Sequence, residues 1–234
     1  MNSLTGYRRE APGAHPPNTH PAYASSHKRA PLHEPIRLAH TLSEITGPGA
    51  GWEETRTAEA DLTHRNGGEA LGERIVVAGR VLDEDGRAVP HTLVEIWQAN
   101  AAGRYDHPTD RHDAPLDPHF SGIGRVLTGA DGTYRLMTVK PGAYPWRNHY
   151  NAWRPQHIHF SLFGPGFATR LITQMYFPGD PLLALDPIFN SVPDAKARAR
   201  LIAAFAIDVT VPERALGYRF DIVLRGRDAT PAGI

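Results

Sequence analysis

Residues 74–98 decide the fold, and they read RIVVAGRVLDEDGRAVPHTLVEIWQ. Two runs rich in branched side chains, 74–82 and 92–98, flank the sequence DEDG, which is typical of a turn. Branched side chains favour extended backbone because they pack well on a pleated, half-buried surface. We therefore predict two β-strands joined by a turn.

The same pattern recurs along the rest of the chain. Strand-like runs occupy residues 133–139, 157–163, 169–176 and 218–225, with turn residues between them. Several short strands separated by regular turns are typical of a β-sandwich. The sequence therefore predicts an all-β fold with a β-sandwich core and one or two short helices.

The clearest helical pattern lies at residues 194–206, DAKARARLIAAFA. Asp194 is suited to cap the N-terminus, and Leu201, Ile202 and Phe205 share one face of an ideal helix. We predict a helix across this range.

The N-terminal region differs in composition from the rest of the chain. Residues 1–50 hold seven of the 21 prolines and five of the 13 histidines, without sustained periodicity. Because proline interrupts helices and sheet ladders, an irregular arm is expected here. We divide the chain into an arm, residues 1–72, packed on a partner subunit, and a β-sandwich catalytic domain, residues 73–234.

The bulk composition excludes several classes of protein. The chain carries 25 basic and 25 acidic residues, whereas nucleic-acid binders usually carry a basic surplus. It has no apolar run long enough to span a membrane, and no apolar secretory segment at residues 1–17, so a cytoplasmic location is expected. The absence of cysteine excludes disulfides and thiolate metal sites. Any metal must be held by nitrogen and oxygen donors.

The sequence His157-Ile158-His159-Phe160 is a candidate ligand pair. Side chains alternate along a strand, so both histidines would point to one face while Ile158 and Phe160 point into the core. Two imidazoles on one face of an anchored strand are suited to bind a metal ion. For such a pair alone, two solvated or hydrogen-bonded histidines remain the commoner interpretation.

Two tyrosines in loops strengthen the metal hypothesis. Tyr105 follows Ala-Gly-Arg, and Tyr144 lies in GAYPWRN, whose proline stiffens the loop. Each tyrosine taken singly is better read as a buried aromatic residue. Taken with His157 and His159, however, two anionic phenolates would suit a hard trivalent ion, Fe(III). Zinc would more usually take three histidines, or histidine with a carboxylate.

At this point the sequence resembles the intradiol ring-cleaving dioxygenase family, and within it the beta subunits of the protocatechuate 3,4-dioxygenase branch. The resemblance covers residues 73–226, and a weaker likeness appears at residues 43–48. The segments that carry it are AGRVLDEDGRAVPHTLVEIWQANAAGRYDH, APLDPHFSGIGR, KPGAYPWRN, WRPQHIHF, LITQMYFPGDP and YRFDIVLRG.

The resemblance implies a non-haem Fe(III) site and a reaction. Tyr144 and His159 would be axial ligands, while Tyr105, His157 and a solvent hydroxide would be equatorial. The implied reaction opens protocatechuate between its two hydroxyl-bearing carbons with O2. The product would be 3-carboxy-cis,cis-muconate, in the β-ketoadipate pathway of aromatic degradation.

The resemblance also implies roles for residues around the iron. Arg154 would stabilise charge that develops on the substrate, and Gln174 would line the pocket. Trp146 and Arg147 resemble pocket-wall residues, and Tyr23 corresponds loosely to a tyrosine that meets the substrate carboxylate. The residues alone leave simpler interpretations open: Arg154 paired with an acidic residue, Gln174 hydrogen-bonded within the sheet, and Trp146 as packing.

The resemblance further implies a homologous alpha subunit that forms αβ units with this chain in a higher oligomer. Other interpretations of the whole chain remain open. It could be a catechol or hydroxyquinol 1,2-dioxygenase, although those enzymes carry a helical N-terminal region. It could also be a metal-free structural or binding β-sandwich subunit, or a zinc hydrolase.

Overall fold

The computed structural model describes residues 10–31, 33, 59–147, 153–163 and 170–233. Much of the predicted arm, including the motif at 43–48, lies outside these residues. All nine residues expected around the iron lie within them. In the described part of the chain, no helix is long and apolar enough to cross a membrane.

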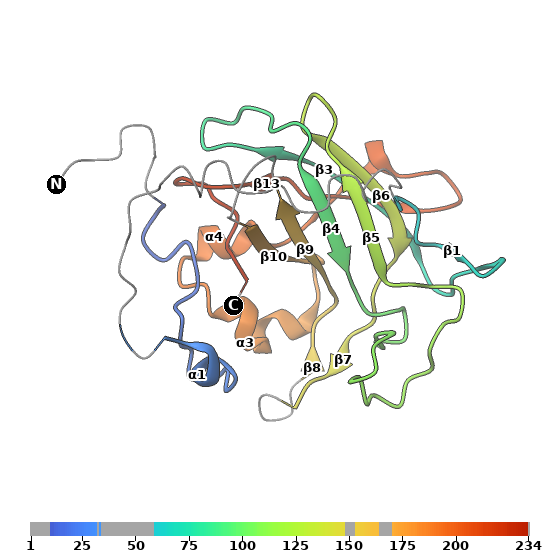
Figure 1. Cartoon of the computed structure of the whole chain (residues 1–234), viewed down its shortest axis with the longest axis horizontal. Helices are drawn as coiled ribbons and strands as arrows, with labels where there is room; N and C mark the ends of the chain where they lie inside the picture. Colours follow the sequence, from blue (N-terminus) through green and yellow to red (C-terminus); the bar gives the residue numbers. More distant parts are fainter. Residues whose placement is uncertain (1–9, 32, 34–58, 148–152, 164–169, 234) are drawn as a thin grey trace.

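Two sheets form the body of the protein (Figure 1). One has the strand order β10-β9-β4-β5, and its strands are antiparallel neighbours. In the other, β3 pairs with β6 antiparallel and with β12 and β13 parallel, and β11 extends it beyond β12. The strands of the first sheet are β4 Leu93–Trp97, β5 Ile123–Leu127, β9 His157–Phe163 and β10 Arg170–Tyr176. Those of the second are β3 Arg74–Leu82, β6 Thr133–Val139, β11 Ala204–Phe205, β12 Leu216–Arg219 and β13 Ile222–Val223.

The remaining elements are short. The hairpins pair β1 His64–Arg65 with β2 Gly68–Glu69, and β7 Tyr144–Pro145 with β8 Trp153–Arg154. The α-helices of the described residues are α1 Ser26–Arg29, α3 Pro187–Asn190 and α4 Ala195–Ala199, three rather than one or two. Two 3-10 helices, η2 Pro181–Leu185 and η3 Ile207–Val209, complete the set. The predicted all-β fold with a β-sandwich core is confirmed.

The main core contains the inward faces of both sheets. Ile75 and Val77 of β3 meet Ile158 and Phe160 of β9 in one buried cluster, and all four are fully buried. Burying each such side chain contributes about 1.5–3 kcal/mol. The predicted alternation along β9 is therefore correct, because Ile158 and Phe160, which alternate with its histidines, lie in this core.

The predicted helix at 194–206 is largely wrong. Asp194 does cap α4, accepting a hydrogen bond from the Lys196 backbone N–H, but the helix ends at Ala199. Beyond it the backbone pairs with the end of β10: the Leu201 carbonyl accepts from Tyr176 N–H, and Ala203 N–H donates to the Tyr176 carbonyl. This tertiary pairing overrides the helical periodicity, and Phe205, in β11, is 51% exposed.

The single strand predicted at 218–225 is divided into β12 and β13. The chain bends at Phe220, whose carbonyl accepts a hydrogen bond from the Tyr134 hydroxyl, 2.5 Å away. At the bend, Arg80 N–H of β3 donates to the Asp221 side chain instead of to a strand partner. Strand β5 and the two-residue strands β1, β2, β7, β8 and β11 were not predicted. Strands β3, β4, β6, β9 and β10 agree with their predicted ranges to within one residue at each end.

The bend requires a glycine opposite it. A Cβ added to Gly79 of β3 would lie 1.9 Å from the Phe220 carbonyl oxygen. Because that oxygen belongs to the backbone, the bend at Phe220 would have to move away from β3. Gly86 offers a matched comparison, because it has a positive φ of 77° and nothing within 4 Å of an added Cβ.

We predict that Gly79→Ala lowers the free energy of unfolding by at least about 2 kcal/mol through this collision. Gly86→Ala should cost only about 1 kcal/mol, from backbone strain alone. Thermal and urea unfolding of both variants measure the difference. Equal losses would show that the bend at Phe220 moves away from β3 without cost.

Candidate active site

The predicted ligands come from three separate segments of the chain. His157 and His159 lie on β9, Tyr144 begins β7, and Tyr105 lies in the loop after β4. The hairpin of β7 with β8, in which Tyr144 faces Arg154 in register, directly precedes β9 in the chain. The structure brings the four residues together: Nε2 of His157 lies 3.2 Å from Nε2 of His159 and 3.3 Å from the Tyr144 hydroxyl.

Both histidines are held with Nε2 toward the site. Nδ1 of His157 lies 2.6 Å from the Pro155 carbonyl, which only accepts, so Nδ1 carries the proton and Nε2 offers its lone pair. The ring of His159 stacks on Trp97, with centroids 4.7 Å apart and planes 3° from parallel. Burial and the nearby Arg154 charge lower the pKa of His157 well below its usual value, and that of His159 to about 3. Both imidazoles are therefore neutral near pH 7, the form that binds metals.

The two tyrosine rings lie side by side, half-buried at the edge of the pocket. Their ring centroids lie 5.4 Å apart, with the planes nearly perpendicular. The Tyr105 hydroxyl is buried and has no hydrogen-bond partner among the described residues. Burial raises the pKa of Tyr105 well above its usual value, and the neighbouring Tyr144 phenol adds to this. Burial also raises the pKa of Tyr144, against the opposing effect of the Arg154 charge. Without a cation, both phenols remain protonated.

Two glycines allow the tyrosine loops to approach each other. A Cβ on Gly103 would lie 2.1 Å from the Ala143 carbonyl oxygen, and one on Gly142 would lie 2.5 Å from the Ala101 carbonyl oxygen. Asn100 joins the same loops. Its carbonyl accepts from Gly103 N–H and Gly142 N–H, and its side-chain oxygen accepts from Arg104 N–H. The spacing of Tyr105 and Tyr144 therefore depends on backbone contacts between these loops.

The four residues fit a metal ion by their chemistry. Two nitrogens each about 2.1 Å from one ion, at right angles to it, would be about 3.0 Å apart. The observed separation of 3.2 Å is close to that. The unpartnered Tyr105 hydroxyl supplies an oxygen donor. No cluster of three or more His, Cys, Asp or Glu suited to a metal occurs in the part of the chain that the structure describes.

Arg154 lies in a buried polar network beside the phenols. Its side chain is 3% exposed and that of Asp186 is 0% exposed, with Nε donating to Asp186 Oδ1 at 3.0 Å. Nη2 donates to Gln174 Oε1 at 2.5 Å. Burial alone lowers the pKa of Arg154, but the Tyr176 and Asp186 oxygens outweigh that effect and raise it. The guanidinium therefore stays charged, and the acidic partner that the sequence left open is Asp186.

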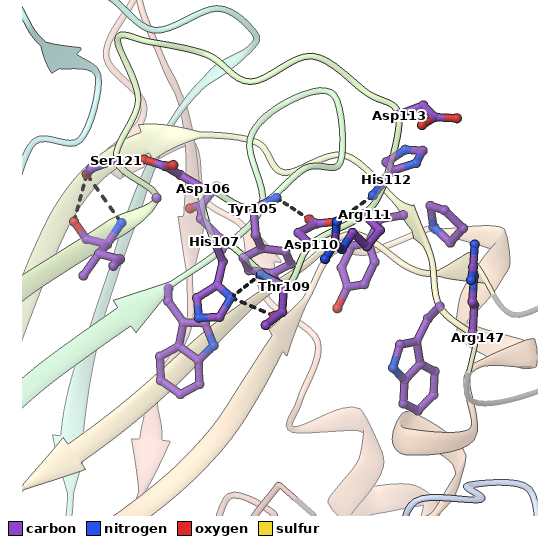
Figure 2. A pocket seen from close by; sticks show the side chains of 17 residues that line it. Tyr105, Asp106, His107, Thr109, Asp110, Arg111, His112, Asp113, Ser121 and Arg147 are labelled. Atoms are coloured by element: carbon purple, nitrogen blue, oxygen red, sulfur yellow. Dashed lines mark hydrogen bonds between the residues drawn. The ribbon is translucent and has the colours of Figure 1, made fainter.

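A pocket of about 740 Å³ opens above the phenols. Tyr105, Tyr144, Trp146 and Arg147 line it, together with Trp97 and the loop of residues 106–113. In Figure 2, this loop runs from Asp106, near Ser121, to His112 and Asp113, on the side where Arg147 lies. A pocket of this size is typical of small-molecule sites.

The other predicted residues lie around this pocket. Gln174 is 6% exposed and is not among the lining residues; its amide oxygen instead faces Arg154 and the Tyr176 hydroxyl. Tyr23 is also buried and contacts Trp146 edge to face, with centroids 5.2 Å apart. The guanidinium of Arg154 lies over the ring of Trp146, 5.4 Å from its centroid. Trp146 thus both packs and lines the pocket.

Sequence analysis missed four residues that organise the site: Trp97, Asn100, Tyr176 and Asp186. A local signal existed for Asp186, because Asp-Pro is a common start of a helix and Asp186 caps α3. Nothing in the local sequence links it to Arg154, 32 residues earlier.

Comparisons with known proteins agree with this geometry. A family model described as dioxygenase matches residues 45–226, and one described as protocatechuate 3,4-dioxygenase beta subunit N terminal matches residues 7–41. The chain is 61% identical to a protocatechuate 3,4-dioxygenase beta chain from Burkholderia cepacia, over 93% of each chain. It is 35% identical to an alpha chain from the same organism, over 69% of this chain and 77% of that one.

A solved structure shows the same fold. The dioxygenase domain of a dioxygenase carbohydrate-binding protein fusion from Streptomyces sp. SirexAA-E matches with a TM-score of 0.53 and 27% identity, covering 72% of this chain and 88% of that one. With the match across nearly the whole length of a beta chain, this chain belongs to the intradiol dioxygenase family, in the branch of the protocatechuate 3,4-dioxygenase beta chains.

Proposed function

We propose that the chain is the iron-carrying subunit of a non-haem Fe(III) dioxygenase that cleaves protocatechuate between its two hydroxyl-bearing carbons. O2 is the second substrate and 3-carboxy-cis,cis-muconate is the product. The observation that carries this proposal is the convergence of two phenols and two imidazoles beneath a pocket. The 61% identity to a protocatechuate 3,4-dioxygenase beta chain supports the choice of substrate.

In this proposal, Tyr105, Tyr144, His157 and His159 hold the iron. When bound, Fe(III) supplies the positive charge that keeps both phenolates and the substrate diol deprotonated, and the redox link between the diol and O2. The neutral imidazoles add no charge, so the two phenolates alone balance part of the positive charge of the ion. This charge balance favours Fe(III) over Fe(II) at the site.

Several residues of the chain act on the substrate directly or through their position. Arg154, held charged beside Tyr144, stabilises negative charge on the diol, and Gln174 holds one guanidinium nitrogen of Arg154. Tyr144 is placed to accept a proton from the substrate as its phenolate. The aromatic walls of the pocket, including Trp146, exclude water and orient the ring.

The substrate carboxylate requires a polar group away from the iron. Arg147 lines the pocket, and Tyr23 lies behind Trp146. We propose that Arg147 attracts the carboxylate and that Tyr23 contributes to its binding.

We also propose that this chain assembles with a homologous alpha chain into αβ units of a higher oligomer. A similar protein in Burkholderia cepacia is called a beta chain, and the same organism has an alpha chain that is also similar to this sequence. In this assembly the arm, residues 1–72, packs on the alpha chain, and residues 73–234 form the catalytic domain.

The proposal is tested by a visible absorption spectrum of the protein, co-expressed with its alpha chain, before and after anaerobic protocatechuate. We expect a broad band from phenolate bound to Fe(III), and a shift of that band when the diol binds. Turnover of catechol under the same conditions should be much slower. A protein that stays colourless after reconstitution with iron would contradict the iron site, and faster turnover of catechol would contradict the substrate.

We predict that Tyr105→Phe and His157→Ala each lose iron or most activity, because each removes a ligand. Iron content, the visible band and kcat/KM for protocatechuate are measured together. Tyr134→Phe provides a control, because its hydroxyl is also buried but bonds to the Phe220 carbonyl, away from the site. Normal iron with full activity in either ligand variant would remove that residue from the site.

We predict that Fe(III) binding releases about two protons, one from each phenol. Both tyrosines have raised pKa values in the metal-free protein, so their hydroxyls are protonated there. Each hydroxyl releases its proton to solvent when it binds the ion. The affinity for Fe(III) must therefore rise with pH. The histidines release none at pH 5–8, because their pKa values are already lowered. Competition against a chelator should show affinity rising about 100-fold per pH unit from the two phenols, once the protons of the chelator and of the iron-bound water are subtracted. Tyr105→Phe should reduce the release by one proton, and an unchanged release would contradict the assignment.

A further inference from the structure

Asp186 is a fully buried carboxylate for which the proposed chemistry provides no role. It lies between η2 and α3, and its Oδ2 accepts from Phe189 N–H and from the Tyr176 hydroxyl. It is also the only described residue of opposite charge within 4 Å of Arg154. A buried ion pair is weak support for stability, since apolar residues of similar volume often replace it without loss.

The contacts of Arg154 fix the guanidinium along one edge. Nε and Nη2 face the two oxygens of Asp186 at 3.0 and 3.3 Å. Nη2 also reaches Gln174 Oε1 at 2.5 Å and the Tyr176 hydroxyl at 3.2 Å. None of these contacts uses Nη1, and the guanidinium also lies close enough to the Tyr144 phenol to oppose the rise of its pKa. Because guanidinium is planar and rigid, anchoring Nε and Nη2 also determines where Nη1 lies.

Arg154 is not among the residues that line the pocket, and its guanidinium reaches the pocket wall through Trp146. It lies over that ring, 5.4 Å from the centroid, and Trp146 lines the pocket. Asp186 is absent from the pocket lining and fully buried among the short helices. The carboxylate therefore holds the guanidinium from behind without contacting the substrate.

We propose that Asp186 is a positioning residue for ring cleavage: its carboxylate holds the Arg154 guanidinium so that the free Nη1 edge serves the bound diol. This inference rests on the proposed function of Arg154. In this inference Asp186 acts on catalysis only through Arg154. Removing Asp186 should therefore not lower activity any further in a variant that already lacks Arg154.

The test is a double-mutant cycle in the full chain with its alpha partner: Asp186→Asn, Arg154→Gln and both together. Asparagine keeps the size and can keep its oxygen toward Phe189 N–H as the cap of α3, while the oxygen that accepts from Arg154 Nε is replaced by an uncharged NH2 group. We expect Asp186→Asn to retain iron and to lower kcat/KM for protocatechuate by roughly 10–100-fold. The double variant should be no less active than Arg154→Gln alone. A double loss equal to the product of the two single losses, or an Asp186→Asn loss below about twofold, would overturn the inference.

Two further readouts separate positioning from a purely structural role. The thermal midpoint of the metal-free double variant should exceed that of metal-free Asp186→Asn, because the double variant leaves no uncompensated buried charge. The anaerobic dissociation constant for protocatechuate should rise in Asp186→Asn and change no further between Arg154→Gln and the double variant. If Asp186→Asn does not fold, comparing Arg154→Gln with the double variant still decides the question.

Asp194→Asn is the matched control, because Asp194 caps α4 in the same way and makes no contact with Arg154. It should leave kcat/KM unchanged. A wild-type protein without iron colour or activity would contradict the proposed function itself. An active wild type together with an Asp186→Asn variant of unchanged kcat/KM would contradict only the role of Asp186.

Discussion

The site depends on the register of β9 between β4 and β10. In that register, His159 lies between Trp97 on one neighbour and Gln174 on the other, and Tyr176 lies opposite His157. One row across the sheet thus provides a ligand, the ring that stacks on it and the amide that holds Arg154. Because strand side chains alternate with a period of two, a slip of one residue would turn both histidines into the core. The buried faces of Ile158 and Phe160 oppose such a slip.

The register of β9 positions only two of the four predicted ligands, His157 and His159. Tyr105 lies in the loop after β4 and Tyr144 begins β7, and the two segments meet because Gly103 and Gly142 permit contacts that a Cβ would block. Asn100 then bonds both loops through its main chain and side chain. The sheet therefore positions the nitrogen donors, and the backbone contacts around Asn100, Gly103 and Gly142 position the oxygen donors. Such a site is held by rigid backbone rather than by mobile loop tips, as a metal centre with fixed geometry requires.

Local sequence determined the parts of the fold that depend on periodicity. The ranges 74–82 and 133–139 agree with β3 and β6, and the alternation along β9 was correct. The helix at 194–206 failed because pairing with Tyr176 of β10, a distant partner, replaced its last turns. The four candidate ligands were singled out by the alternation of the two histidines, by the donor chemistry of the two tyrosines and then by resemblance to a family, and their proximity became visible only in three dimensions. Asp186 was missed for the same reason: its tie to Arg154 is a contact between distant segments.

The electrostatics of the metal-free site suggest why an ion would complete it. Burial raises the pKa of both phenols and lowers that of both imidazoles, so all four groups are neutral. The Tyr105 hydroxyl also has no hydrogen-bond partner among the residues that the structure describes. Arg154 adds a positive charge, but Asp186 balances it on the side away from the pocket. A trivalent ion would ionise the phenols and give the buried hydroxyl a partner. Binding of that ion would therefore add to the stability of the folded state, because the unfolded chain offers no such convergence of donors.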